Sequence, residues 1–275
     1  WYQPFEEFRL RLVRLVDRLL DILDQDPDYR HYMLDGQTIV LDDYLAVRPE
    51  AEPRIREHIR SGRLLIGPWY ILPDEFLAGP ESHIRNLLQG AATCARFGAR
   101  MEVGNIPDPF GHISQLPQIL RGFDIETAVF TRGVGEAANE FEWAAPDGSS
   151  VLVIHQREGY GNAASLPVDV AAFIARIQRI IDDLAPYATT PHLLAMNGTD
   201  HEEPLAELPR LLDAARAALP EVALRHGTLP QFIAAVRAAA PALELRRGEM
   251  RDPSRFHLLP GVLSTRMWIK QRNAA

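Results

Sequence analysis

Asp108 stands between two prolines in the stretch NIPDPFGHISQLPQIL, residues 105–120. Pro107 has a fixed φ angle, and Pro109 restricts the residue before it to an extended backbone, so a stiff segment carries the carboxylate. A carboxylate presented in this way can serve in acid–base, nucleophilic or metal-binding chemistry. The same residues are also typical of a helix start, with Asp108 as N-cap and Pro109 at the first helical position. The local sequence leaves both interpretations open.

Other acidic, basic and aromatic residues follow runs of sequence that are typical of β-strands. They are Asp74 and Glu75 after residues 63–70, Arg132 at the end of 126–132, His155 within 150–156 with Tyr160 just beyond it, and Asp200, His201, Glu202 and Glu203 after 192–198. Parallel β/α folds bring the carboxyl ends of their strands to one rim, so these groups are predicted to gather around Asp108. Each of them alone would more often be a helix cap or a solvated charge. Together, they favour an active site over a purely structural domain.

Two carboxylates on one rim, with aromatic residues near them in sequence, suit a sugar-binding site. Glycosidases use one acid to protonate the leaving oxygen and a second carboxylate to attack the sugar or to activate water. Trp69, Trp143 and Tyr160 are candidates for stacking on a sugar ring, although both tryptophans are equally compatible with packing in the core. The chain has no glycine-rich phosphate loop and no Gly-x-Ser-x-Gly motif, which argues against phosphate-loop enzymes and serine hydrolases.

A metal site is a further possibility. Asp108 and His112 are separated by the spacing of one helical turn, which is familiar for metal ligands, and His257 lies beyond the last clear β-rich run. Spacing alone does not assign these ligands. The single cysteine, Cys94, rules out a disulfide framework within the chain and argues against a cysteine-based zinc site. It is predicted to be buried and inert.

The composition is that of an ordinary globular protein. The chain has 275 residues, of which 47% are hydrophobic, and a formal net charge of −8. The negative charge argues against a nucleic-acid or anionic-membrane partner, since either would favour a basic surface. Neither a membrane-spanning apolar run nor a signal-peptide pattern is found, so a cytoplasmic protein is predicted.

The elements that must position these residues follow an alternating pattern. β-Rich runs are predicted at 30–36, 63–70, 101–106, 126–132, 150–156, 192–198, 222–227 and 243–250. Helices are predicted from Pro4 onward and at 50–61, 81–97, 168–185, 204–219 and 229–240. This alternation is typical of an α/β fold with a mostly parallel sheet. Because such folds usually open on a strand and this chain opens on a helix, the first strand is expected upstream of Trp1.

Six segments, in order over nearly the whole chain, carry a family resemblance. They are WYQPFEEFR, LDGQTIVLDDY, GRLLIGPWYILPDEF, PDPFGHISQLPQILRGF, NGTDHEEP and HLLPGVLSTRMWIKQRN. Together they resemble the bacterial α-mannosidases of glycoside hydrolase family 38. The resemblance implies a seven-stranded β/α barrel that hydrolyses terminal α-mannosides with retention, uses one zinc ion, and is followed by helical and β domains. Residues 1–275 would then be the catalytic domain, truncated at both ends, of an enzyme for which a homo-oligomer is a candidate assembly.

The resemblance also implies roles for individual residues. Asp108 matches the nucleophile, which is also a zinc ligand, and His257 matches a second zinc ligand. Asp200 matches the general acid/base, although Thr199 stands where some members have another Asp. The implied substrate-binding residues are Trp1, Trp69, Asp74, Arg132 and Tyr160.

The main departure from the family pattern concerns the metal. The other two zinc ligands belong to a His-x-Asp-x-x-Trp motif whose Trp matches Trp1, so they are expected just before it. Taken as a whole, the family resemblance implies a zinc-dependent retaining α-mannosidase with a glycosyl-aspartate intermediate. The alternative is a catalytically silent sugar-binding or structural fragment. A polysaccharide deacetylase would need a His-x-x-x-His pair, which is found neither at His155 nor at His201.

Overall fold

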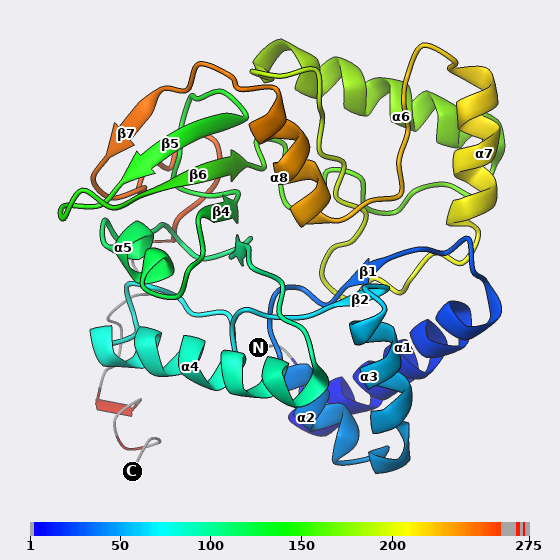
Figure 1. Ribbon diagram of the computed structural model, residues 1–275, viewed down its shortest axis with the longest axis horizontal. Coiled ribbons are helices and arrows are strands. Elements are labelled where there is room, and N and C mark those ends of the chain that lie inside the picture. Colours follow the sequence, from blue (N-terminus) through cyan, green and yellow to red (C-terminus); the bar gives the residue numbers. More distant parts are fainter. Residues whose placement is uncertain (1–2, 260–267, 270–271, 273–275) are drawn as a thin grey trace.

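The computed structural model describes residues 3–259, 268–269 and 272 (Figure 1). Its strands are β1 (Tyr32–Met33), β2 (Leu64–Leu65), β3 (Gly104–Asn105), β4 (Thr127–Phe130), β5 (Glu140–Ala144), β6 (Ser150–His155) and β7 (Leu245–Arg247). Its α-helices are α1 (Phe5–Gln25), α2 (Ile39–Leu45), α3 (Glu52–Arg60), α4 (Pro80–Phe97), α5 (Leu116–Arg121), α6 (Val170–Leu184), α7 (Leu208–Ala218) and α8 (Leu229–Ala238). Two 3₁₀ turns, η1 (Pro49–Ala51) and η2 (Ala185–Tyr187), complete the elements.

The strands form two sheets. β1 and β2 make a parallel pair, and the larger sheet has the strand order β3-β4-β6-β5-β7. β3, β4 and β6 run parallel to one another, whereas β5 is antiparallel to β6 and parallel to β7. The predicted α/β class is thus confirmed. In the described residues the larger sheet is a five-stranded mixed sheet, and closure into a seven-stranded barrel remains a prediction.

Two predicted strands are absent from the sheets, at 192–198 and 222–227. The backbone of the first segment bonds to a neighbouring loop, because Asn162 accepts from the Met196 N–H (2.7 Å) and donates to the Leu194 carbonyl (2.9 Å). One side chain thus takes the place of a strand partner. In the second segment, the Leu224 carbonyl accepts from a side chain of α7.

The structure also contains a strand that sequence reasoning missed. β5 and β6 form a hairpin around the turn Pro146-Asp147-Gly148, where Gly148 has a φ angle of 91°. Asp147 Oδ1 accepts from the Ser149 N–H at 3.0 Å, which is a turn contact typical of Asp. A Pro-Asp-Gly sequence between two apolar runs is a recognised hairpin signal.

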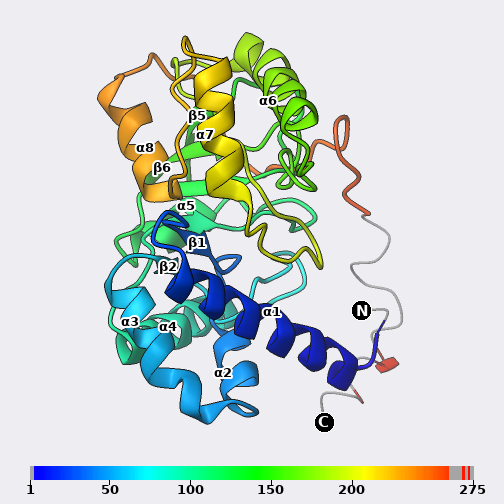
Figure 2. The ribbon, with the colours of Figure 1, turned by 90° about the vertical axis from the view of Figure 1, so that its right-hand side faces the viewer.

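The long helices agree with their predicted ranges to within a few residues because their apolar faces have a clear helical period. α1 buries Val16, Leu19, Leu20 and Leu23 in a cluster with α2, α3, β2, α6 and α7. In Figure 1, α1 to α4 lie in the lower half, and the larger sheet with α6, α7 and α8 lies in the upper half. Figure 2 shows α6 and α7 packed together. Cys94 is buried in α4, as predicted.

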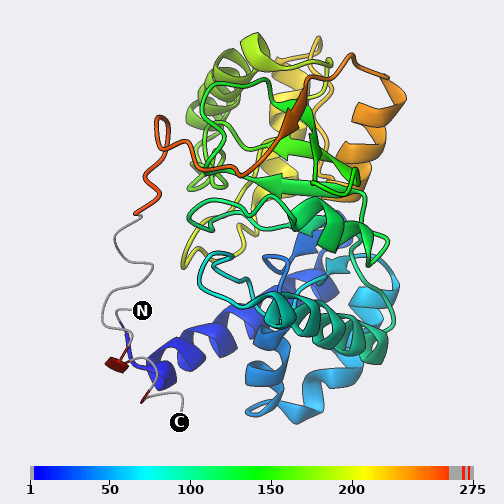
Figure 3. The same ribbon diagram turned by 90° about the vertical axis from the view of Figure 1, so that its left-hand side faces the viewer.

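A second apolar cluster lies around the larger sheet and includes Trp69, Phe130, Phe141 and Trp143. Both tryptophan side chains are completely buried. The chain after β7, coloured orange to red, leaves the sheet and runs along the outside of the fold (Figure 3). No helix within the described ranges is long and apolar enough to cross a membrane.

Candidate active site

Asp108 lies in the loop between β3 and α5, at the carboxyl end of a parallel strand. The loop continues the β-ladder, since the Ile106 N–H donates to the Val129 carbonyl at 2.9 Å. The next helix, α5, begins only at Leu116, so the interpretation of Asp108 as a helix N-cap is wrong. The stiff prolines keep the backbone extended, and Asp108 stays half-buried at the rim.

Arg132, at the end of β4, binds Asp108 directly. Its Nε donates to Asp108 Oδ1 at 2.7 Å, and its second terminal nitrogen lies 2.7 Å from the same oxygen. Its remaining terminal nitrogen donates to the His257 carbonyl at 2.8 Å, while the ring of Phe110 lies 5.1 Å below the guanidinium. The Arg132 guanidinium thus contacts two other residues that were predicted to form the site, Asp108 and His257.

Burial raises the pKa of Asp108 above its ordinary value. The hydrogen bond and the charge of Arg132 oppose this rise, while repulsion from Asp200 and Asp74 adds to it. Asp200 is thus close enough for its charge to act on Asp108. Pro107, which precedes Asp108, lines a cavity that Asp200 also lines.

Asp200 and Tyr160 bind each other. The Tyr160 hydroxyl donates to Asp200 Oδ1 at 3.3 Å, and both side chains line a cavity of about 2090 Å³. Burial, followed by repulsion from Asp108 and Asp200, raises the pKa of Tyr160 to about 12, so its hydroxyl stays protonated at neutral pH. It can therefore remain a donor to Asp200.

Asp35 is another carboxylate that lines this cavity, and sequence reasoning did not single it out. It follows β1, accepts from Gln37 Nε2 at 3.1 Å, and has a positive φ angle of 28°. Desolvation by the surrounding protein raises the pKa of Asp35 to about 6. The hydrogen bond from Gln37 opposes this rise, and repulsion from Asp200 and Asp108 adds to it. Its position near the end of the β-rich run 30–36 was the available signal.

The remaining predicted substrate-binding residues have different surroundings. Trp69 is completely buried and its Nε1 donates to the Asn105 carbonyl at 3.0 Å, so it packs in the core and offers no face to a sugar here. Asp74 is half-buried, and its Oδ1 accepts from the Phe110 N–H at 3.1 Å, which ties it to the Asp108 loop. Trp1 lies outside the described residues.

Several other polar residues from the predicted rim have structural contacts. Glu202 accepts from the Ser165 N–H at 2.6 Å, and Glu203 forms an ion pair with Arg18. His201 packs edge-on against Phe8. These contacts fix the loop that carries Asp200.

His155 is also structural, since it is buried and its Nε2 donates to the Thr131 carbonyl at 3.2 Å. Burial lowers its pKa to about 4, with the Thr131 hydrogen bond opposing this shift. Between about pH 6.5 and 4 the unfolded chain therefore binds one more proton than the folded chain at this residue. The free energy of unfolding must fall as the pH falls through this window.

We expect His155 to account for about 2–3 kcal/mol of the stability lost between pH 7.5 and 4.5. Urea denaturation of the wild-type and His155→Gln proteins at both pH values measures this contribution. Glutamine can still donate to the Thr131 carbonyl but does not titrate, so the variant should lose correspondingly less stability. Equal losses in the two proteins would contradict the assignment of a neutral, buried His155.

The metal predictions receive only partial support. Across the described parts of the chain, no group of three or more His, Cys, Asp and Glu side chains is arranged to hold a metal ion. His112 is buried, and its Nδ1 donates to Glu75 rather than pointing to the rim. Asp108 and His257 would supply two zinc ligands, whereas zinc in proteins usually has three or four. The described residues therefore do not form a complete zinc site.

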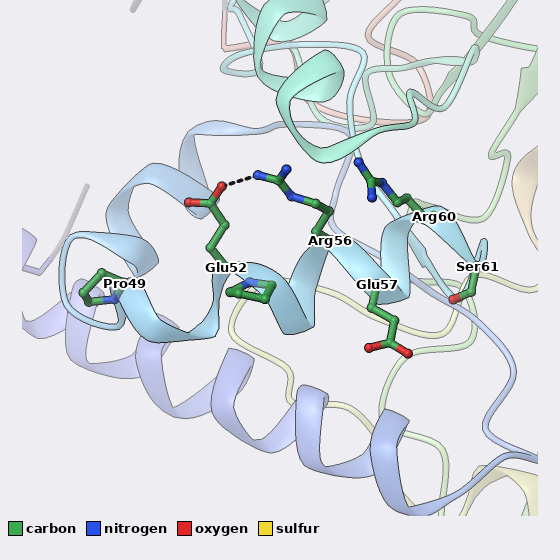
Figure 4. Close-up of a pocket in the computed structure, with 7 residues that line it drawn as sticks. Pro49, Glu52, Arg56, Glu57, Arg60 and Ser61 are labelled. Carbon is green, nitrogen blue, oxygen red and sulfur yellow. Dashed lines mark hydrogen bonds and ion pairs between the residues drawn. The ribbon is translucent and has the colours of Figure 1, made fainter.

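A second, shallow hollow of about 830 Å³ lies on the surface of α3 (Figure 4). It is lined by residues of η1 and α3 and by the following Ser61, and Glu52 and Arg56 form an ion pair across one side of it. None of the predicted site residues contributes to it. The rim around Asp108 is therefore the better candidate for an active site.

Known proteins resemble this chain over most of its length. The family described as Glycosyl hydrolases family 38 N-terminal domain matches residues 1–254. A Halalkalibacterium halodurans protein named "Putative mannosylglycerate hydrolase" is 39% identical over 82% of this chain and 27% of its own length. The Dictyostelium discoideum protein named alpha-mannosidase G is 28% identical over 55% of this chain and 14% of its own.

A solved structure agrees with these matches. The crystal structure of an alpha-mannosidase from Enterococcus faecalis V583 superposes with a TM-score of 0.89 and 36% sequence identity. The match covers 91% of this chain and 29% of that one, so the chain spans less than a third of the length of these relatives. The family match, the sequence identity and the superposition agree. This chain belongs to glycosyl hydrolase family 38 and corresponds to the N-terminal domain of that family.

Proposed function

We propose that the protein is a glycoside hydrolase that cleaves terminal α-mannosides with retention of configuration. The observation that carries this proposal is that a chain of family 38 contains two carboxylates, Asp108 and Asp200, each bound by the side chain of another predicted site residue. Asp108 is held by Arg132, and Asp200, held by Tyr160, is close enough for its charge to raise the pKa of Asp108. Retaining glycosidases need two such carboxyl groups about 5–5.5 Å apart.

In the first step, an oxygen of Asp108 attacks the anomeric carbon while the bond to the leaving oxygen breaks and Asp200 gives that oxygen a proton. Both contacts from Arg132 go to Asp108 Oδ1, and none of the described residues donates a hydrogen bond to Oδ2. We assign the attack to Oδ2. The Arg132 charge favours the ionised carboxylate that the attack requires.

In the second step, Asp200 takes a proton from water as the water oxygen attacks the anomeric carbon. As the water oxygen attacks, the bond between the anomeric carbon and Asp108 breaks, which restores the carboxylate and leaves the product in its original configuration. Tyr160 keeps one oxygen of Asp200 in place, so the other can exchange the proton in both steps. Arg132 would also stabilise the Asp108 carboxylate as it is released.

A small mannosyl metabolite and a mannosylated glycan are both candidate substrates. The Halalkalibacterium halodurans relative is named for mannosylglycerate, and the Dictyostelium discoideum and Enterococcus faecalis relatives are named alpha-mannosidases. We propose zinc as the cofactor, with Asp108 and His257 as two ligands and the remaining ligands upstream of Trp1. Because the described residues do not complete this site, we assign no reaction step to the metal.

The test compares this chain with a form extended upstream through the predicted first strand. Both are supplied with zinc and assayed on a chromogenic α-mannoside and on mannosylglycerate, while bound metal is quantified and NMR identifies the anomer released first. Turnover with α-mannose as the first product is expected, and we call the form that shows it the active form. A folded protein that binds mannosides without turnover in either form would favour the silent sugar-binding alternative.

Removing the His257 imidazole is expected to lower the zinc content of the active form. The Arg132 contact is made by the His257 backbone carbonyl, so His257→Ala leaves that hydrogen bond possible. Metal analysis after dialysis should show a clear loss of zinc relative to wild type. His192→Ala, which removes a partly exposed histidine that is not a predicted zinc ligand, is the control. An unchanged zinc stoichiometry in His257→Ala would contradict the ligand role.

A further inference from the structure

Glu75 and His112 form a completely buried pair behind the rim. The His112 Nδ1–H donates to Glu75 Oε1 at 2.6 Å, and neither side chain has any exposed surface. Glu75 Oε2 accepts from the Ile113 N–H at 2.8 Å. Both oxygens of one buried carboxyl group therefore bind the segment that follows Asp108.

The pair is anchored on its other side to α4. His83, in the first turn of that helix, is buried and its Nε2 donates to the Glu75 carbonyl at 3.1 Å. The preceding residue, Asp74, accepts from the Phe110 N–H at 3.1 Å. Two consecutive acidic residues thus bind the chain at positions two, four and five residues beyond Asp108.

The backbone of His112 carries the connection further, to the segment after β7. His112 and Met250 exchange two hydrogen bonds, of 2.9 and 3.0 Å. The packing there is tight: a Cβ atom on Gly111 would lie 2.8 Å from the Met250 carbonyl oxygen, and one on Gly133 would lie 2.2 Å from it. The segment then leads to His257, whose carbonyl binds Arg132. Three loops of the rim therefore meet at His112.

We propose that Glu75 and His112 are positioning residues that hold the Asp108 loop in the geometry needed for attack on the sugar. This proposal rests on the proposed function, in which Asp108 is the nucleophile. Neither residue reaches the rim, so their effect passes through the backbone of residues 108–113. A shift of about 1 Å in a reacting group is enough to lower a rate about 100-fold.

The chemistry of the pair supports a positioning role better than a packing role. His112 lies against Phe130 with ring centroids 4.0 Å apart, and Trp143 is the next ring, at 6.3 Å. Apolar side chains would fill such surroundings at no cost in desolvation. A hydrogen-bonded pair, unlike an apolar one, fixes the direction as well as the position of the segment it binds.

Two substitutions of His112 separate these roles. His112→Asn places an amide N–H close to the position of Nδ1 and keeps a donor for Glu75, whereas His112→Leu has a similar volume and no donor. Both remove the ring from Phe130, and the smaller Asn leaves more empty space there than Leu, so loss of packing alone would make His112→Asn the more damaging change. His58→Leu is the control, because His58 is buried and its Nε2 donates to the exposed Asp24 at 2.6 Å, in a pair between α3 and α1 and away from the rim.

In the active form, we expect His112→Leu to lower kcat about 100-fold with KM changed little, and His112→Asn to recover most of that loss. His58→Leu should lower stability without lowering kcat. Equal kcat values for the two His112 variants, or a loss of kcat that only follows the folded fraction measured by urea denaturation, would overturn the proposal.

Hydrogen exchange of the backbone amides tests the anchor without any assay of activity. His112→Leu should speed exchange in residues 110–113 and 250–252 about 10-fold or more, while exchange in β4 and β6 stays unchanged. Unchanged exchange in both segments would overturn the positioning role even in a fully active enzyme. Absence of turnover by the wild-type protein would instead refute the proposed function and leave this measurement decisive for the anchor.

Discussion

Asp108→Asn is expected to abolish turnover by the active form while leaving the fold nearly intact. An amide oxygen is a poor nucleophile, and loss of the nucleophile in enzymes of this kind lowers kcat by about 10⁴-fold or more. Asp108 is half-buried, and an asparagine oxygen can still accept from Arg132, so the free energy of unfolding should change by about 1 kcal/mol or less.

Steady-state kinetics, together with urea denaturation of the same samples, measures both effects. Glu102→Gln is the matched control, because Glu102 is an exposed acid just before β3 and forms an ion pair with Arg100 at 3.4 Å. This variant should retain wild-type turnover. Normal activity in Asp108→Asn would remove the nucleophile assignment.

Asp200→Asn is expected to show a loss of activity that depends on the leaving group. Asparagine has no acidic proton to give, so a mannoside with a poor leaving group should be cleaved about 10²- to 10⁴-fold more slowly. An aryl mannoside with an acidic phenol needs no protonation, so its first step should proceed at nearly the wild-type rate. The Tyr160 hydroxyl can still donate to the asparagine oxygen, which preserves the local geometry.

Added azide gives a second test of this role, because azide can attack the covalent mannosyl–Asp108 intermediate without help from a general base. In Asp200→Asn, azide should restore turnover of the aryl substrate and give mannosyl azide with retained configuration. Glu207→Gln is the control, because Glu207 lies seven residues further along the chain and is exposed. Equal losses on both substrates without rescue by azide would contradict the acid/base role of Asp200.

Sequence reasoning located the long helices more accurately than it located the strands. A long amphipathic helix such as α6 records its buried face in its own sequence, so its predicted range (168–185) agrees with the observed one. A strand depends on partners elsewhere in the chain. Residues 192–198 have the composition of a strand but bond to Asn162, so composition alone could not predict their pairing.

The same distinction applies to the candidate site. Asp108 and Arg132 could be chosen because each follows a β-rich run, and the structure joins them directly. Trp69 was chosen by residue type, yet it is buried, since its neighbours in space come from the larger sheet. The pairing of His112 with Glu75 spans 37 residues and had no local signal, so the spacing of His112 from Asp108 suggested a metal ligand instead.

The pairing of β7 with β5 has a consequence for how the protein folds. It joins Glu142 to Leu245, about 100 residues along the chain, and contacts between such distant residues form slowly because the intervening chain must first be ordered. Met250 and His257 follow β7, so the Asp108 loop gains this support only after the last strand has docked. In a refolding experiment, we therefore expect recovery of activity to lag behind recovery of helical circular dichroism.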